Sequence, residues 1–237
     1  MTWSIVALDS NGALGVAVAS RFFAVGALCP AVLARCGALC TQALMNPLYA
    51  RDGLAALASG ESAEAVVARL TGADAGREMR QVHAIDATGR TAAHTGSSCI
   101  AWCGHVAGAG FSVAGNMLAG AEVIERTARA YEAASALPFA ERLLAAMDAG
   151  EAAGGDKRGK QAAALVVHTT EDYPFLSLRV DDHAEPLAEL RRLHAVSLER
   201  FQPFVACLPS RADPTGITDR AVIEERIARF QAARGRS

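Results

Sequence analysis

The second residue of the chain is the first that could do chemistry. Thr2 follows Met1 and opens an apolar run, Trp3 to Leu8, that is typical of a strand. Once Met1 is removed, Thr2 carries a hydroxyl nucleophile and a free α-amine on one residue. An α-amine titrates near about pH 8, so it can accept the hydroxyl proton at neutral pH. Thr2 is therefore the candidate nucleophile, and an ordinary strand residue is the alternative.

A second candidate stands where another strand ends. Gly115-Asn116 follows the apolar segment Phe111–Ala114 at a turn, where a backbone N–H and a side-chain carboxamide can face one point. Two fixed donors of this kind stabilise the oxyanion that forms when an amide is attacked. Asn116 is therefore the candidate oxyanion donor, and a simple Gly-Asn turn is the alternative.

Two other polar residues have structural alternatives of their own. Asn46 precedes Pro47, which is the pattern of a helix N-cap followed by proline at the first helical position. His94 ends a strand in His94-Thr95-Gly96, where its imidazole can contact substrate, carry a proton or simply hold the structure. Both are kept as candidate substrate-binding residues.

The segment Gly154–Lys160 has the glycine and lysine spacing of a phosphate-binding loop. Gln161 stands where that loop needs Ser or Thr, and a helix precedes it instead of a strand. We therefore expect no nucleotide cofactor. Asp156, together with Lys157 or Arg158, is expected to form a polar rim or an ion pair.

The cysteines are expected to be reduced core residues and not metal ligands. Cys36 with Cys40, and Cys99 with Cys103 and His105, have spacings found at zinc sites. On a strand, however, an offset of four residues separates two thiols by about 13 Å. The sequence therefore predicts no metal and no other cofactor.

The pattern of apolar residues predicts strands, then a helix pair, and then the same order again. The predicted strands are 4–9, 14–20, one within 32–43, 81–86, 91–95, one around 105, 111–114, 162–169 and 175–180. The predicted helices are 46 to about 59, 62–70, 120–134, 138–150, 186–201 and 219–233.

This order predicts an α+β fold: a four-layer αββα sandwich with two antiparallel sheets between helical layers. Each helix pair buries an apolar stripe on a sheet, and the two sheets bury their other faces on each other. Because strict strand–helix alternation is absent, a doubly wound parallel sheet fits less well. We expect one domain over residues 1–237, with the last 40 to 50 or so residues forming a helical C-terminal extension.

Charge and hydropathy exclude several classes of partner. The chain has 23 basic and 25 acidic residues, a formal charge of −2, and no basic stripe, which argues against nucleic acid and anionic membrane. The longest apolar stretch, residues 22–34, is too short to span a bilayer. No basic segment precedes an apolar core at the N-terminus, so we expect a cytoplasmic protein.

An ordered set of motifs resembles the bacterial family called domain of unknown function 1028, which is placed among the N-terminal-nucleophile (Ntn) hydrolases. The motifs are Thr2-Trp3-Ser4-Ile5-Val6-Ala7, Leu14-Gly15-Val16-Ala17-Val18-Ala19-Ser20, Thr41-Gln42-Ala43, Asn46-Pro47, Ala93-His94-Thr95-Gly96, Gly115-Asn116-Met117-Leu118 and Gly154-Gly155-Asp156-Lys157-Arg158-Gly159.

The resemblance implies a mechanism in which the N-terminal residue attacks an amide carbonyl and its own α-amine relays the proton. The N-terminal segment of this chain is also similar to the opening of proteasome subunits. In those subunits a turn follows the second strand, and a basic residue lies on the next strand. Ser20-Arg21 occupies that turn here, and Arg35 is expected on the next strand. Ser20, Arg21 and Asp156 are thus further candidate substrate-binding residues.

The sequence therefore predicts an Ntn-type hydrolase that cleaves a carbon–nitrogen bond of a small amide or peptide-like substrate. The alternative is a non-catalytic ligand-binding or assembly protein that keeps the same sandwich. In either case a homodimer or higher homo-oligomer is the default expectation.

Overall fold

The computed structural model describes residues 2–235, which form two compact units. The first unit ends at Leu190 and the second begins at Arg191. The strands are β1 (Thr2–Leu8), β2 (Leu14–Ser20), β3 (Pro30–Leu33), β4 (Gly37–Ala43), β5 (Arg80–Asp86), β6 (Thr91–Thr95), β7 (Gly104–Gly108), β8 (Phe111–Asn116), β9 (Ala162–His168) and β10 (Leu176–Val180).

Two helix pairs interrupt this strand order, and further helices follow β10. The helices are α1 (Leu48–Ala58), α2 (Ala63–Gly72), α3 (Glu122–Ala133), α4 (Phe139–Ala152), α5 (Pro186–Ser197), α6 (Phe201–Val205) and α7 (Arg220–Arg234), with 3₁₀ turns η1 (Val25–Ala27) and η2 (Arg77–Met79).

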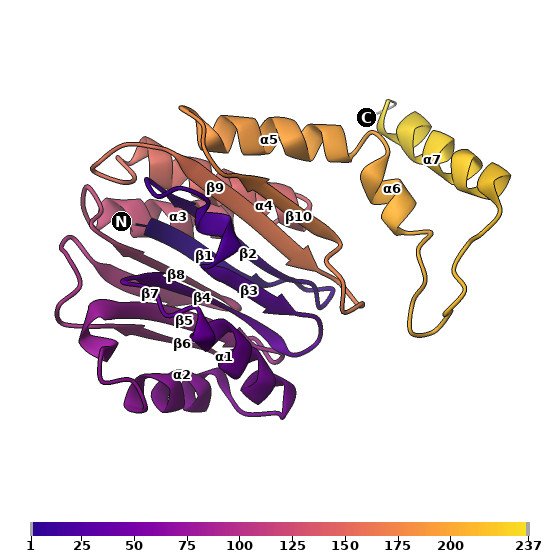
Figure 1. Cartoon of the computed structure of the whole chain (residues 1–237). Helices are drawn as coiled ribbons and strands as arrows, with labels where there is room; N and C mark the ends of the chain where they lie inside the picture. Colours follow the sequence, from indigo (N-terminus) through magenta and orange to yellow (C-terminus); the bar gives the residue numbers. More distant parts are fainter. Residues whose placement is uncertain (1, 236–237) are drawn as a thin grey trace. The chain divides into compact units, whose positions relative to one another are not determined.

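The first unit is a four-layer α+β sandwich, as predicted. One antiparallel sheet has the strand order β10-β9-β2-β1-β8-β7 (sheet A), and the other has the order β3-β4-β5-β6 (sheet B). Helices α3 and α4 pack on the outer face of sheet A, and α1 and α2 pack on the outer face of sheet B (Figure 1). The inner faces of the two sheets pack on each other.

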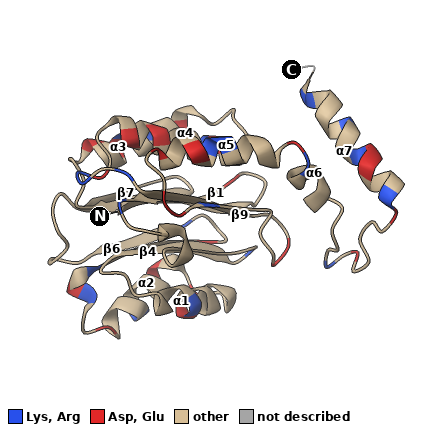
Figure 2. Cartoon of the chain, turned by 45° about the horizontal axis from the view of Figure 1, so that its top comes forward, with Lys and Arg blue, Asp and Glu red and all other residues tan. Residues whose placement is uncertain are grey.

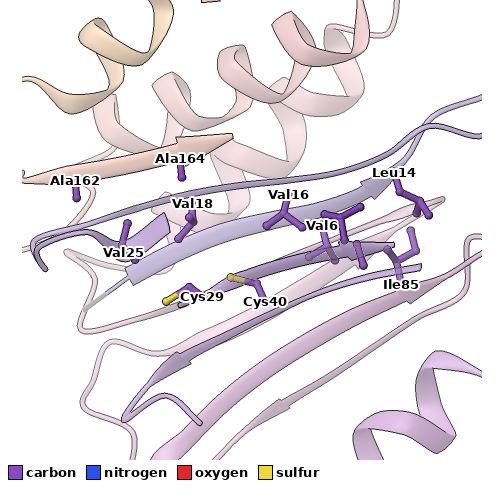
Figure 3. Close-up of a cluster of buried hydrophobic side chains, with 12 residues drawn as sticks. Val6, Leu14, Val16, Val18, Val25, Cys29, Cys40, Ile85, Ala162 and Ala164 are labelled. Atoms are coloured by element: carbon purple, nitrogen blue, oxygen red, sulfur yellow. The ribbon is translucent and has the colours of Figure 1, made fainter. Parts of the chain in front are cut away.

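β1 lies at the centre of sheet A, between β2 and β8, and both of its faces are covered. Its residues are buried except at the last position, which explains the continuous apolar run in the sequence. Val6 points into the cluster between the sheets, with Val16 and Val18 of β2 and Ile85 of β5 (Figure 3). The same alternation places Thr2 and Ser4 on the inner face.

Two sequence predictions about the elements are wrong. The segment 32–43 contains the whole of β4, as predicted, and also the end of β3, with which β4 forms a hairpin. Arg35 lies in its turn with a φ of +63°, and not on a strand, because the left-handed backbone there reverses the chain. The helix predicted over 186–201 ends at Ser197, and α6 follows as a separate short helix.

Charged side chains gather on the helices and loops of the first unit and are sparse on its strands (Figure 2). This distribution follows from burial, since the central strands of each sheet are covered on both faces. Within residues 2–235, no helix combines the length and the apolar character that crossing a membrane requires.

Candidate functional site

The ends of three adjoining strands bring Thr2, Ser20 and Asn116 together. Thr2 of β1 pairs with Ser20 of β2 on one side and with Asn116 of β8 on the other. The Thr2 hydroxyl donates to Ser20 Oγ at 3.1 Å, and Asn116 Nδ2 lies 3.5 Å from the Thr2 carbonyl oxygen. All three residues are buried. Both predicted catalytic residues therefore lie at one point on the inner face of sheet A.

Sheet B orients the Asn116 carboxamide through two glutamines. Asn116 Nδ2 donates to Gln81 Oε1 at 3.0 Å, and Gln42 Nε2 donates to the same oxygen at 2.7 Å. These bonds fix the amide nitrogen of Asn116, which also lies near the Thr2 carbonyl oxygen. At 3.5 Å, its contact with the Thr2 carbonyl oxygen is longer than an ordinary N–H···O bond, so this second hydrogen bond of the Asn116 amide is weak.

The backbone amide that follows Asn116 is already used. Met117, which follows Asn116, donates its N–H to the Ile100 carbonyl at 2.8 Å. The Asn116 carboxamide, in contrast, lies near the Thr2 carbonyl oxygen.

Gln81 is fixed in turn by three acceptors. Its Nε2 lies 2.9 Å from the Gly115 carbonyl, 3.0 Å from the Gly104 carbonyl and 2.9 Å from Thr95 Oγ1. Gly104 and Gly115 belong to sheet A, and Thr95 to sheet B. Gln81 therefore ties the two sheets together directly behind Asn116.

A buried histidine extends this polar layer away from Thr2. His83 Nε2 lies 2.8 Å from Ser4 Oγ, which also donates to Gln42 Oε1 at 2.8 Å, and His83 Nδ1 lies 3.1 Å from Ser112 Oγ. Burial lowers the pKa of His83 to about 3, with a smaller effect from His105. His83 is thus neutral at pH 7, where its two nitrogens match two hydroxyls that can each donate or accept.

This polar layer was not predicted from the sequence; it consists of Ser4, Gln42, Gln81, His83 and Ser112. One signal was present in the sequence. Gln81 and His83 are two residues apart in a predicted strand, so their side chains share a face that the sandwich requires to be buried. Buried polar side chains need partners, which predicts matching polar residues on the opposite sheet.

Arg21 and Asp156 also meet, next to Ser20. Asp156 Oδ2 accepts the backbone N–H of Arg21 at 2.7 Å and pairs with the Arg158 guanidinium at 3.2 Å, while the Arg21 guanidinium donates to the Arg158 carbonyl at 2.9 Å. The Asp156 carboxylate is only 2% exposed. Ser20 and Asp156 line a small cavity of about 90 Å³ together with Lys160. Asp156 thus holds the loop beside Ser20, as the ion-pair interpretation predicted.

Asn46 and His94 are placed elsewhere. Asn46 Oδ1 accepts the Leu48 N–H at 3.1 Å, which caps α1, and its Nδ2 lies 3.3 Å from Asp74. His94 pairs with Val82, whose side chain packs in the helix-facing cluster of sheet B, and its Nε2 lies 3.0 Å from the Arg77 carbonyl. The structure therefore does not bring these two candidates to Thr2.

No group of three or more His, Cys, Asp or Glu side chains within residues 2–235 is arranged to hold a metal ion. Cys36 lies in the β3–β4 turn, so the distance argued for two thiols on one strand does not apply to it.

Comparison with known proteins places the chain in a family. The model of a family of unknown function, DUF1028, matches residues 2–190. The chain belongs to the DUF1028 family. The crystal structure of a DUF1028 protein from Silicibacter pomeroyi is similar, with 32% sequence identity, a TM-score of 0.85, and coverage of 92% of this chain and 99% of that one. No match is found among curated proteins. The DUF1028 match begins at Thr2 and ends where the first compact unit ends.

Proposed function

We propose that this DUF1028 chain is an Ntn-type hydrolase that cleaves the C–N bond of a small amide, with Thr2 as the nucleophile. The observation that carries the proposal is the meeting of Thr2, Ser20 and the oriented Asn116 carboxamide at adjoining strand ends. The αββα sandwich is a second argument for the proposal. It places Thr2 at the start of a central strand, where the strands on either side hold a nucleophile in position.

In the proposed reaction, Thr2 Oγ1 attacks the amide carbonyl carbon and passes its proton to the α-amine of the same residue. The Asn116 Nδ2–H stabilises the resulting oxyanion. The C–N bond then breaks, and the protonated α-amine gives its proton to the leaving amine. Water attacks the Thr2 ester, releases the carboxylic acid and restores the hydroxyl. Ser20, which accepts the Thr2 hydroxyl in the resting site, holds Oγ1 in place.

The α-amine of Thr2 is free only after Met1 is removed. Met1 lies outside the residues that the structure describes, so its removal is part of the proposal. The first measurement is therefore the intact mass of untagged protein from its native organism. A chain that keeps Met1 there would overturn the proposal and favour the binding or assembly alternative.

The second measurement is labelling by an acylating probe, with turnover of an amide library, in protein that lacks Met1. We expect Thr2→Ala to abolish labelling and turnover and Thr2→Ser to retain labelling, because serine keeps both groups. Thr170→Ala, which changes an exposed threonine, is the control and should behave as wild type. Labelling that survives in Thr2→Ala would exclude Thr2 as the nucleophile.

A further inference from the structure

An apolar pocket opens beside Asn116, on the side where β4 and β8 end. Its volume is about 230 Å³, and its walls include Leu44, Met79, Ile100 and Met117. Leu44, Met79 and Ile100 are each about half exposed, at 57%, 48% and 56%. Large apolar side chains left open to solvent around one cavity indicate a surface that binds something apolar.

Strained backbone builds the walls of this pocket. Ala43 and Met117 have φ values of +66° and +53°, which non-glycine residues rarely adopt. Ala43 is the last residue of β4, after Gln42, and Met117 directly follows Asn116 at the end of β8. Strain of this kind persists where the surrounding structure enforces it, and it concentrates at ligand sites.

The hydrogen bonds that enforce this strain join the pocket walls to one another. The Leu44 N–H donates to the Met79 carbonyl at 3.1 Å, and the Met117 N–H donates to the Ile100 carbonyl at 2.8 Å. The backbone that turns away from Gln42 and Asn116 therefore holds all four apolar side chains around the same space.

Charges beside the pocket are paired with other groups. The Arg80 guanidinium bonds Asp74 at 3.1 Å and donates to the Leu44 carbonyl. The Glu78 carboxylate accepts the Ser97 N–H at 3.0 Å and its hydroxyl at 2.8 Å, and these bonds lower the pKa of Glu78. A charged group that entered the pocket would lose hydration without gaining a partner.

We infer that this pocket binds the acyl part of the substrate, and that this acyl group is an uncharged aliphatic chain. The inference rests on the proposed function, because Asn116 lies between Thr2 and the pocket. A substrate whose carbonyl oxygen meets Asn116 Nδ2 has one substituent directed into the pocket. An apolar cavity of about 150 Å³ takes up benzene, so this larger one suits a chain of about six to eight carbons.

The test compares kcat/KM for three p-nitroanilides, which carry an acetyl, a hexanoyl or an adipoyl group, in protein that lacks Met1. The last two have the same length, and adipoyl ends in a carboxylate. Each methylene buried in an apolar pocket changes kcat/KM by about tenfold or more. We expect the hexanoyl amide to exceed both others by at least about tenfold. Equal kcat/KM for acetyl and hexanoyl, or for adipoyl and hexanoyl, would overturn the inference.

Ile100→Lys places a positive charge on the pocket wall at a half-exposed position. We expect it to lower kcat/KM for the hexanoyl amide and to raise it for the adipoyl amide. Leu137→Lys makes the same change at an exposed leucine between α3 and α4 and should keep the wild-type preference. If Ile100→Lys left the ratio of kcat/KM for the hexanoyl amide to kcat/KM for the adipoyl amide unchanged, the acyl group would bind elsewhere.

Binding of hexananilide and adipoyl anilide to Thr2→Ala, measured by calorimetry, separates the two proposals. Preferential binding of hexananilide, reversed by Ile100→Lys, supports the pocket even if wild type shows no turnover, in which case the hydrolase proposal fails alone. If neither anilide binds, and wild-type turnover does not depend on acyl chain length, the inference about the pocket is wrong while the hydrolase proposal stands.

Discussion

Gln81 joins the two sheets at the point where the candidate site needs a fixed carboxamide. Its Oε1 accepts from Gln42 and Asn116, and its Nε2 bonds the Gly115 carbonyl. Gln81→Leu leaves these buried groups without partners, and a buried unsatisfied group costs about 1–3 kcal/mol. We predict that the free energy of unfolding falls by roughly 3 kcal/mol, measured by urea denaturation.

Gln161→Ala is the matched control, because that glutamine bonds Asp182 at an exposed position. Its unfolding free energy should stay within about 0.5 kcal/mol of wild type. If Gln81→Leu were equally harmless, the polar layer would not hold the sheets together.

His83 makes stability depend on pH. Its folded pKa of about 3 lies below the unfolded value of about 6.5, because burial disfavours the charged imidazole. As the pH falls, His83 is therefore protonated in the unfolded chain at a higher pH than in the folded chain, which favours unfolding. The contribution of His83 is complete above about pH 6.5 and is lost progressively as the pH falls toward 3.

We predict that His83→Gln flattens the dependence of unfolding free energy on pH between about pH 4 and 6.5. Urea denaturation at several pH values measures the slope. His183→Gln, at an exposed histidine, is the control and should keep the wild-type slope. A slope that His83→Gln leaves unchanged would assign the pH dependence to other groups.

The sequence predicted some residues of this site and missed others for a physical reason. Thr2 and Asn116 could be selected because each stands at a predicted strand end, and the structure places them side by side. Gln42 and Gln81 are cross-strand neighbours in sheet B, and they reach Ser4 and Asn116 only when the two sheets face each other. No spacing along the chain encodes those contacts between the sheets. The catalytic role of Thr2 stays a prediction.

Among the elements, those with a strong local pattern were predicted well. Residues 14–20 and 91–95 match β2 and β6 at both ends, because turn residues bound each run. The β3–β4 hairpin was missed because arginine, which gives no turn signal, takes the left-handed position at Arg35. The tertiary fold imposes that conformation, so local propensity does not reveal it.

The loop after β6 depends on a glycine that touches backbone. A Cβ on Gly96 would lie 2.3 Å from the Glu78 carbonyl oxygen and 2.5 Å from that of Arg77. Because both contacts are with main-chain atoms, no side-chain rotation relieves them. We predict that Gly96→Ala lowers the unfolding free energy by about 1–3 kcal/mol, measured by urea denaturation.

Gly72→Ala is the control for that change. Gly72 ends α2 and would meet no atom within 4 Å. Alanine favours a helix over glycine, so this variant should be neutral or more stable by up to about 1 kcal/mol. A Gly96→Ala variant as stable as Gly72→Ala would mean that a small shift of η2 relieves the Gly96 contact.

At the scale of the whole chain, the two compact units differ in how well their helices are anchored. α4 in the first unit has 14 residues and buries Phe139, Leu143, Leu144 and Met147 among others. α7 in the second unit has 15 residues, of which Ile227 alone is buried. A helix of this length draws most of its stability from packing, so α7 should open far more often than α4.

We predict that the amides of α7 exchange hydrogen at least about 100-fold faster than those of α4, measured by mass spectrometry at low protein concentration. The same experiment bears on the proposed homo-oligomer. If a second copy of the chain covers α7, its exchange slows as protein concentration rises, while exchange in α4 stays constant. Protection of α7 equal to that of α4 at every concentration would contradict the prediction, because the burial of Ile227 alone does not account for it.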